Sequence, residues 1–410
     1  MGQSTFPTPS AGASYSSQPP ANASSVLLDG SLVNSSSYST TVTGTGASWL
    51  LYANGAGAII ITVGSDSYTI PSGSTVGTSV YTGSKSVTIN GIAGTPSKFF
   101  ASTMPTNDNW RGVAYGLVGA TNYYVAVASG TAANAYSTDG INWIVSTLPA
   151  ADNWTSVTYG NGKFVAVQGS GTTDGAYSTN GVTWTATTMP TGGSSAGWYG
   201  VTYGNGYYVA IAGDGGGNTT AAGYSTNGIN WTASTMPSNS GWIGVTYGNG
   251  YFVSVATSST AAAYSTNGTT WTASTLPSSL QWKSVAYGLV GATPTYVAVA
   301  YSTNSIAYST NGTTWTASTL PSSGTSWTAV TYGNGYFVTV NYGTTLGAYS
   351  TNGSTWTALT MPSTAGGWQA IAYGNLKFVV TASSNTGAYY AFSSAVPVAY
   401  GIYNGPTATH

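Results

Sequence analysis

The sequence predicts an all-β protein that is built mainly from repeats. Tryptophan begins a phrase of the form Trp-x-x-hydrophobic-x-Tyr-Gly seven times, at intervals of 40 to 45 residues. Three more phrases follow it in fixed order, with forms such as GYFVSVA, AYSTNG and TWTASTLP. Each phrase is short, rich in Val, Thr, Tyr or Trp, and bounded by Gly, Asn or Pro, as β-strands are. Four antiparallel strands in a repeat of this length is the pattern of a β-propeller blade.

The tryptophan starts predict a seven-bladed β-propeller of four-stranded blades. They are Trp110, Trp154, Trp198, Trp242, Trp282, Trp327 and Trp368. The last copy lacks an STNGxTW phrase after Gly387, whereas Phe99–Pro105 (FFASTMP) matches the missing strand. We therefore expect a strand at Phe99–Thr103 to pair with three strands from the C-terminal end, which would close the ring and remove open sheet edges. In an alternative, residues 389–399 form that last strand, although Pro397 disfavours a central position.

Asn-Gly pairs lie at the expected turns of each blade. The phrase YGNGYF places Asn-Gly between two predicted strands, which is typical of a hairpin whose two central residues have positive φ. The phrase STNG is expected to form the same kind of turn between the third and fourth strands.

The third and fourth phrases carry a family resemblance. The run STDGINW at Ser137–Trp143, and the matching runs that end at Trp184, Trp231, Trp271, Trp315 and Trp356, resemble the Asp-box, or sialidase-like, β-propellers. The turn is one residue shorter than the commonest family form, and Asp is replaced by Asn180, Asn227, Asn267, Asn311 and Asn352. Either side chain accepts hydrogen bonds from turn N–H groups, so we expect the turn to persist.

Four segments are expected along the chain. Residues 1–25 read as an extended N-terminal arm, because they are rich in Ser, Pro and Ala. Residues 26–97 contain about six short strand patterns and predict a small β-sandwich that anchors the protein. The propeller is expected over residues 98–400, and residues 401–410 form a C-terminal tail.

The composition limits the functions that the chain can have. Charged residues make up 3% of it, all seven acidic residues are Asp, cysteine is absent, and His410 is the only histidine. A near-neutral surface gives no electrostatic attraction for nucleic acid or anionic membranes. The N-terminus lacks the basic and apolar regions of a secretory signal, and no apolar run is long enough to insert in a membrane. We expect no cofactor and no metal, with a calcium site near Asp214 as an open alternative.

The family resemblance implies a sialidase, but the residues argue against an enzyme. Sialidases use an arginine triad and a Tyr–Glu nucleophile pair, whereas this chain has one arginine and no glutamate. Other glycoside hydrolases need two paired carboxylates, and no Asp here stands in a recognisable motif. A glycan hydrolase therefore stays an outsider. Thirteen of the fourteen tryptophans occupy only two positions of the repeat, and Trp49 lies in the N-terminal domain, so we interpret the thirteen as packing residues and not as sugar-binding ones.

A binding site is expected where the repeats differ. In a propeller of this pattern the Asp-box turns lie on one face, and the loops that vary most lie on the opposite face. The residue directly after each strand-start tryptophan also varies. The candidate ligand-binding residues on this variable face are Arg111, Tyr199, Lys283, Asp152, Asp174, Asp214, Tyr301 and Tyr342.

The architecture and composition favour a structural or binding protein of a bacteriophage virion, namely a tail fibre, a receptor-binding protein or a capsid fibre. The expected partners are virion proteins at the N-terminal region and host surface glycan at the propeller, which places the protein on the virion surface. A homo-oligomer stays an open alternative. The runner-up is a bacterial extracellular adhesin or surface-layer component.

Overall fold

The computed structural model describes the greater part of the repeats and the strands outside them. The described residues are 24–27, 38–42, 49–50, 59–63, 66–70, 80–81, 85–91, 99–170, 174–191, 197–213, 218–322, 326–361, 367–375, 377–383, 385–392 and 399–402. Every regular element in these residues is a β-strand. This part of the chain therefore has no helix that is long and apolar enough to cross a membrane.

The chain divides into two compact units. One is Pro96–Ala391 and contains the repeats, and the other combines Met1–Thr95 with Phe392–His410. The two ends of the chain meet in the second unit, where β1 (Ser24–Leu27) pairs antiparallel with β31 (Ala399–Ile402). The expected propeller boundary at residue 400 is therefore too far along the chain, and the last two residues of the expected arm belong to β1. The arm before Ser24 and the tail after Ile402 lie outside the described residues.

The N-terminal strand patterns do form strands. A four-stranded sheet has the order β2 (Tyr38–Val42), β7 (Lys85–Gly91), β4 (Ile59–Val63), β5 (Asp66–Ile70). A separate pair joins β3 (Trp49–Leu50) to β6 (Val80–Tyr81). That these sheets form a β-sandwich stays a prediction.

The repeat is a four-stranded antiparallel meander. One copy consists of β24 (Trp327–Gly333), β25 (Tyr336–Asn341), β26 (Leu346–Ser350) and β27 (Thr357–Thr360), and each strand pairs with the next. The remaining strands are β8 (Phe100–Val118), β9 (Thr121–Ser137), β10 (Ile144–Gly160), β11 (Lys163–Gln168), β12 (Asp174–Ser178), β13 (Thr185–Thr188), β14 (Gly197–Gly204), β15 (Tyr207–Gly213), β16 (Thr219–Ser225), β17 (Thr232–Gly248), β18 (Tyr251–Thr257), β19 (Ser259–Ser265), β20 (Thr272–Val290), β21 (Thr293–Tyr301), β22 (Ser305–Ser309), β23 (Thr316–Thr319), β28 (Gly367–Gly374), β29 (Lys377–Ser383) and β30 (Asn385–Phe392). In β8, β10, β17 and β20 a fourth strand runs on into the first strand of the next copy.

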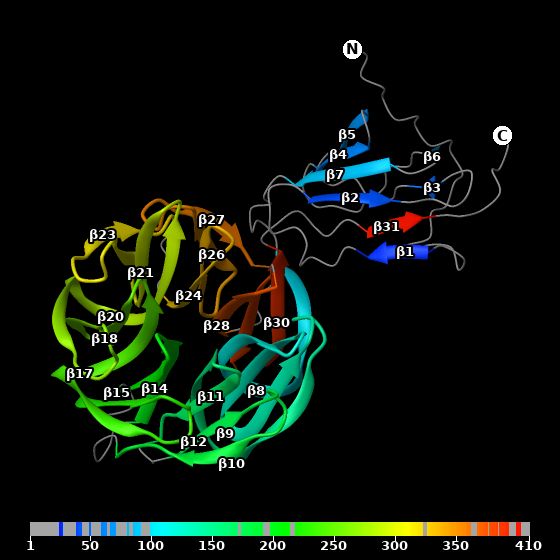
Figure 1. Cartoon of the computed structure of the whole chain (residues 1–410). Coiled ribbons are helices and arrows are strands. Elements are labelled where there is room, and N and C mark those ends of the chain that lie inside the picture. The colour runs from blue at the N-terminus through cyan, green and yellow to red at the C-terminus, as the bar shows by residue number, and fades with distance from the viewer. Residues whose placement is uncertain are drawn as a thin grey trace. The chain divides into compact units, whose positions relative to one another are not determined.

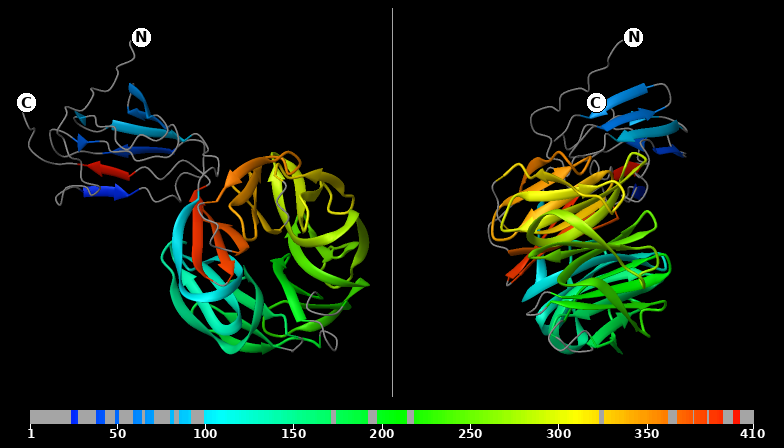
Figure 2. Two further views of the ribbon diagram at one scale, coloured as in Figure 1. Left: turned by 180° about the vertical axis from the view of Figure 1, so that it is seen from behind. Right: turned by 90° about the vertical axis from the view of Figure 1, so that its left-hand side faces the viewer.

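The meanders stand side by side around a central axis, and the first strand of each lies innermost (Figure 1). Figure 2 shows the same ring from behind and from the side, with the sheets twisted as strands generally are. The first repeat strand closes the ring as expected. Residues 100–103 of β8 pair with β30, and β30 belongs to the sheet that contains β29 and β28. The alternative, in which residues 389–399 supply the last strand, is wrong for this sheet, because the strand next to β30 is β8.

The two kinds of Asn-Gly turn differ in conformation. In the YGNG hairpin that follows β10, Asn161 has a φ of 43° and Gly162 a φ of 74°, as predicted. The STNG turn is built differently, and only its glycine has positive φ, for example Gly181 at 72°. The Oδ1 atom of Asn180 accepts hydrogen bonds from the N–H groups of Val182 (2.9 Å) and Thr183 (2.8 Å). Asparagine thus supports this turn as expected, although the turn is not a second copy of the YGNG hairpin.

The tryptophans are packing residues, as the sequence predicts. The seven strand-start tryptophans are at most 1% exposed, and the indole N–H of Trp154 donates to the backbone oxygen of Ala150 (3.1 Å). The turn-end tryptophans are more peripheral, since Trp271 is 8% exposed and Trp231 is only half-buried. The side chain of Trp49 lies outside the described part of the structure.

The Tyr-Gly ending of each first strand locks one meander to the next. A Cβ atom on Gly160 would overlap the ring of Tyr203, and a Cβ on Gly204 would overlap the ring of Tyr247. The same contact recurs around the ring and ends with Tyr115 on Gly374, so the last repeat meets the first in the same way. Only glycine leaves room for a ring at this distance from the backbone.

Hydroxyl groups on the outer strands form a second link between neighbouring meanders. Ser234 Oγ donates to the backbone oxygen of Thr269 in the next STNG turn (2.7 Å), and Ser318 Oγ donates to that of Ser354 (2.6 Å). Ser102, on the strand that closes the ring, donates in the same way to Ile141. Leu359 replaces this serine where the next repeat has no STNG turn, and its side chain is buried instead. The serine of the TAST phrase is therefore a structural residue.

Candidate functional site

A β-bulge lies directly after each strand-start tryptophan. In the pairing of β14 with β15, for example, Trp198 faces Ala212 and Gly200 faces Ile211, so the register shifts at Tyr199. A bulge lets a strand direct one side chain away from its regular alternation. The residues at this position form the bulge ring, which consists of Arg111, Thr155, Tyr199, Ile243, Lys283, Thr328 and Gln369.

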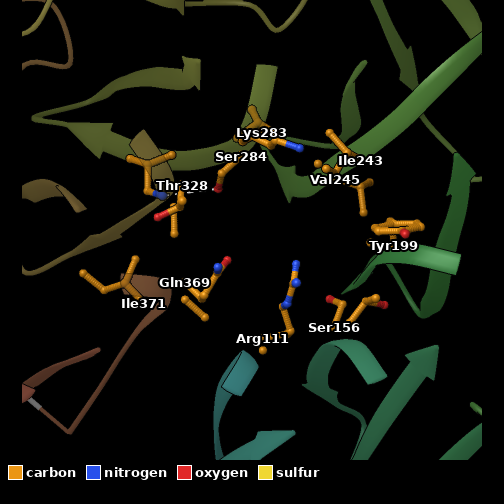
Figure 3. Close-up of a pocket in the computed structure, with 18 of the residues that line it drawn as sticks. Arg111, Ser156, Tyr199, Ile243, Val245, Lys283, Ser284, Thr328, Gln369 and Ile371 are labelled. Atoms are coloured by element: carbon orange, nitrogen blue, oxygen red, sulfur yellow. Dashed lines mark hydrogen bonds between the residues drawn. The ribbon is translucent and has the colours of Figure 1, made fainter. Parts of the chain in front are cut away.

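The bulge ring surrounds one central cavity of about 490 Å³. Figure 3 shows Arg111 and Gln369 pointing into this space, with Tyr199, Ile243, Lys283 and Thr328 around it. Gln281, Tyr301 and Tyr342 also line it: Gln281 directly precedes Trp282 within β20, Tyr301 ends β21, and Tyr342 directly follows β25. The volume is in the range of small-molecule binding sites.

The cavity is layered along its axis. Next to the bulge ring is a layer of glycine, serine and alanine, which includes Gly200, Ser284 and Ala370. Behind it lies an apolar layer, which we call the valine layer: Val113, Val157, Val201, Val245, Val285, Val330 and Ile371. Among the described residues, none farther along the first strands lines the cavity. A ligand would therefore meet polar side chains at the bulge ring and apolar ones at the inner end.

The charged groups of the cavity lining are all positive. Arg111 and Lys283 line it, and no Asp in the described part of the chain is among its lining residues. The Nε atom of Arg111 donates to Oδ1 of Asn109 (3.2 Å), and Nζ of Lys283 lies 6.0 Å from the centre of the Tyr301 ring, within reach of a cation–π contact. These contacts are made by neutral side chains.

Two members of the bulge ring have structural roles. The hydroxyl of Thr155 donates to the backbone oxygen of Trp198 (2.6 Å), and that of Thr328 donates to the backbone oxygen of Trp368 (2.7 Å). Threonine at this position thus joins neighbouring first strands. The side chains that distinguish one repeat from another at the ring are those of Arg111, Tyr199, Ile243, Lys283 and Gln369.

The structure brings together five of the eight predicted site residues. Arg111, Tyr199, Lys283, Tyr301 and Tyr342 all line the central cavity.

Two of the three predicted aspartates, Asp152 and Asp174, are not among the lining residues. Oδ1 of Asp152 instead accepts hydrogen bonds from Ser170 Oγ (2.5 Å) and from the N–H of Asn153 (2.7 Å). Asp174 begins β12, and Asp214 lies outside the described residues. The described chain also has no cluster of three or more His, Cys, Asp or Glu residues that could hold a metal ion.

Two lining residues that the sequence left out of the predicted site are Ile243 and Gln369. Their variation was visible in the sequence, but strand alternation alone does not say where a bulge residue points. The Trp-x-x-hydrophobic spacing is the signal that identifies them. Strict alternation would put the tryptophan and the hydrophobic residue on opposite sides of the sheet, whereas the bulge puts both on the same side.

Comparison with solved structures identifies the architecture. A virginiamycin B lyase from Staphylococcus aureus matches 72% of this chain over 99% of its own length, with 13% identity and a TM-score of 0.62. The fold is a β-propeller. YCF48 with a bound D1 peptide (13% identity, 74% of this chain, 96% of that chain, TM-score 0.56) and the WD40 propeller domain of Doa1 (11%, 72%, 97%, 0.55) are also similar.

These likenesses concern the propeller fold alone, because the sequences are far apart. No family model matches the sequence, and no curated protein matches it either. The meanders described above are the blades of this propeller, and the bulge ring lies at the entrance of its central cavity.

Proposed function

We propose that this protein is a non-catalytic binding protein of a bacteriophage virion, and that its propeller binds host surface glycan in the central cavity. One observation carries the binding part of this proposal. The blades are nearly identical in sequence, yet the bulge ring holds six different residue types among its seven members, and these side chains line one cavity. Packing constrains the neighbouring tryptophan and valine positions, whereas it does not require this variety.

The chemistry of the cavity suits a sugar. Tyr199, Tyr301 and Tyr342 offer aromatic faces for sugar rings together with hydroxyl groups. Gln281 and Gln369 add amide donors and acceptors, which suit the hydroxyl groups of a glycan. Hydrolysis of a glycosidic bond would need a pair of carboxyl groups, and the described lining residues include none. These features favour binding over cleavage.

The virion part of the proposal rests on composition and organisation. The chain has 3% charged residues and many Ser, Thr, Gly and Tyr residues, and a separate β-unit accompanies the propeller. We propose that residues before the propeller attach the protein to other virion proteins and that the propeller is displayed as part of a tail fibre, a receptor-binding protein or a capsid fibre.

We also propose that the propeller has seven blades of the Asp-box type. Seven tryptophan starts, the closing pair of β8 with β30, and the contact of Tyr115 with Gly374 support this blade number. The hydrogen bonds of Asp139 and of the asparagines that replace it support the turn type. The β-sandwich character of the N-terminal unit belongs to the same proposal.

An array of bacterial surface polysaccharides tests the binding proposal. The wild-type protein should bind a subset of the array, and Tyr199→Ala and Arg111→Ala should weaken that binding with little change in melting temperature. Thr269→Ala is the matched control, because Thr269 lies in an STNG turn at the opposite end of the blade. Equal loss of binding in the control, or unchanged binding in both cavity variants, would contradict the proposed site.

A further inference from the structure

The cavity concentrates positive charge in a protein that has very little charge. The whole chain contains six Lys and Arg residues, and its formal net charge is −1. Two of the six cations line this one cavity, and none of the Asp residues that the structure describes is among the lining residues. A cleft whose fixed charges have one sign raises the local concentration of ligands of opposite sign.

The two cations belong to different parts of the ring. Arg111 is on β8 and Lys283 is on β20, so three first strands separate them on one side of the ring and two on the other. Both occupy the bulge position, and both are therefore at the same level of the cavity. A negatively charged group at this level can meet a guanidinium, which binds carboxylate or phosphate in a planar fork, and an ammonium point charge.

The valine layer adds a second requirement. Its side chains are 6–9% exposed at Val113, Val157, Val201 and Val330, so they offer apolar contact only at the inner end of the cavity. A purely polar ligand would leave this layer in contact with water. An apolar substituent on the ligand would remove the surface of the valine layer from water, which is favourable.

We infer that the cavity is selective for an anionic sugar, with its carboxylate or phosphate at the level of Arg111 and Lys283 and a methyl-bearing substituent against the valine layer. This inference rests on the proposed function, since it names the class of glycan that the same site binds. Neutral glycans of the same size lack the charge that the two cations attract.

Matched pairs of polysaccharides test the charge requirement. The acidic members of the array that bind are tested again after reduction of their carboxyl groups to alcohols or removal of their phosphates. We expect the treated polysaccharides to bind at least about tenfold more weakly, as the loss of a charge-assisted hydrogen bond implies. The two treatments distinguish carboxylate from phosphate as the group that is recognised.

Variants locate the effect within the molecule. Arg111→Gln and Lys283→Gln should each weaken binding to acidic polysaccharides by about tenfold. Lys163→Gln removes the same charge from the start of β11, outside the cavity lining, and should leave binding unchanged. Equal weakening by Lys163→Gln would show a general charge effect and would overturn the inference.

The outcomes separate this inference from the proposed function. Equal binding of neutral and acidic polysaccharides, lost in Tyr199→Ala but not in the two cation variants, would leave glycan binding intact and overturn the charge requirement.

Absence of binding to any polysaccharide would overturn the proposed function. In that case hexanoate, with hexanol as the uncharged control, tests the cavity directly by saturation-transfer NMR. A signal from hexanoate alone that disappears in Lys283→Gln supports an anion site with an apolar end. No such signal overturns it.

Discussion

We propose that the residue after each strand-start tryptophan determines what this propeller binds. Its variation was predictable from the sequence, because the phrases around it hardly change. The sequence did not show that these side chains line a single cavity. Strict alternation of inward and outward side chains along a strand does not take the bulge into account. Asp152 shows the opposite case. It is a charged loop residue that looked like a ligand-binding group, and its carboxylate is held by Ser170 and Asn153.

The lowered pKa of the Asp139 carboxyl group leads to a prediction about stability in acid. Partial burial raises the pKa of its carboxyl group, but hydrogen bonds from the N–H groups of Asn142 and Ile141 and from the side chains of Asn142 and Ser137 lower it further, and the net pKa is below the ordinary value of 3.8. Since the folded-state pKa is the lower one, the stabilisation is complete above the unfolded pKa and is lost as pH falls through the folded pKa.

Asp139→Asn tests this, because asparagine fills the same position in five other blades and does not titrate there. The melting temperature of the wild-type protein should fall more steeply than that of the variant as pH is lowered from about 5 to about 2. Identical pH profiles would show that the carboxylate does not contribute through its ionisation.

The two tryptophan positions should differ in their effect on stability. Trp198 is fully buried, so Trp198→Ala should lower the free energy of unfolding by about 3–5 kcal/mol. Trp231→Ala should cost less, because Trp231 is only half-buried, and the sequence alone gave no reason to separate the two. Denaturant titration measures both, and a greater loss for Trp231→Ala would contradict this order.

Individual strands and turns were the part of the structure that could best be predicted from the sequence. The YGNG hairpins and the strand order within a blade follow from local turn chemistry and residue preferences. The STNG turn was predicted less well, because the hydrogen bonds of Ser178 and Asn180 replace the second positive-φ residue that a two-residue hairpin would need. Contacts between blades were not predictable, since they depend on residues of neighbouring repeats.

The Tyr-Gly contact between blades predicts a strong effect from a small change. Gly160→Ala would place a methyl group inside the ring of Tyr203, and overpacking of this kind costs about 1–3 kcal/mol. Thr185→Ala on the exposed outer strand β13 is the control and should change the free energy of unfolding by less than about 0.5 kcal/mol. Urea unfolding measures the free energy of unfolding of both variants. Equal stability of the two would show that the contact of Tyr203 with Gly160 does not stabilise the ring.

At the scale of the whole molecule, the closing strand was predictable and the end of the propeller was not. Closure could be recognised because FFASTMP repeats a phrase that the last blade lacks. The pairing of β1 with β31 joins segments from opposite ends of the chain, and neither segment belongs to the repeat. No periodicity in the sequence connects them, so the C-terminal boundary was placed too late.

The proposed division of labour predicts the effect of a deletion. Removing residues 1–23, which stops before β1, should abolish incorporation into virions and leave the propeller folded. Circular dichroism and melting curves check the fold, and particle incorporation is measured on purified virions. Normal incorporation of the shortened chain would show that attachment depends on another part of the molecule.

Replacement of the whole bulge ring tests most directly the claim that this ring binds the ligand. Threonine already occupies the ring at Thr155 and Thr328, where its hydroxyl joins neighbouring blades. A variant with threonine in place of Arg111, Tyr199, Ile243, Lys283 and Gln369 should therefore fold and melt like the wild-type protein. We predict that it binds none of the surface polysaccharides that the wild-type protein binds on the same array. Undiminished binding by this folded variant would contradict the claim.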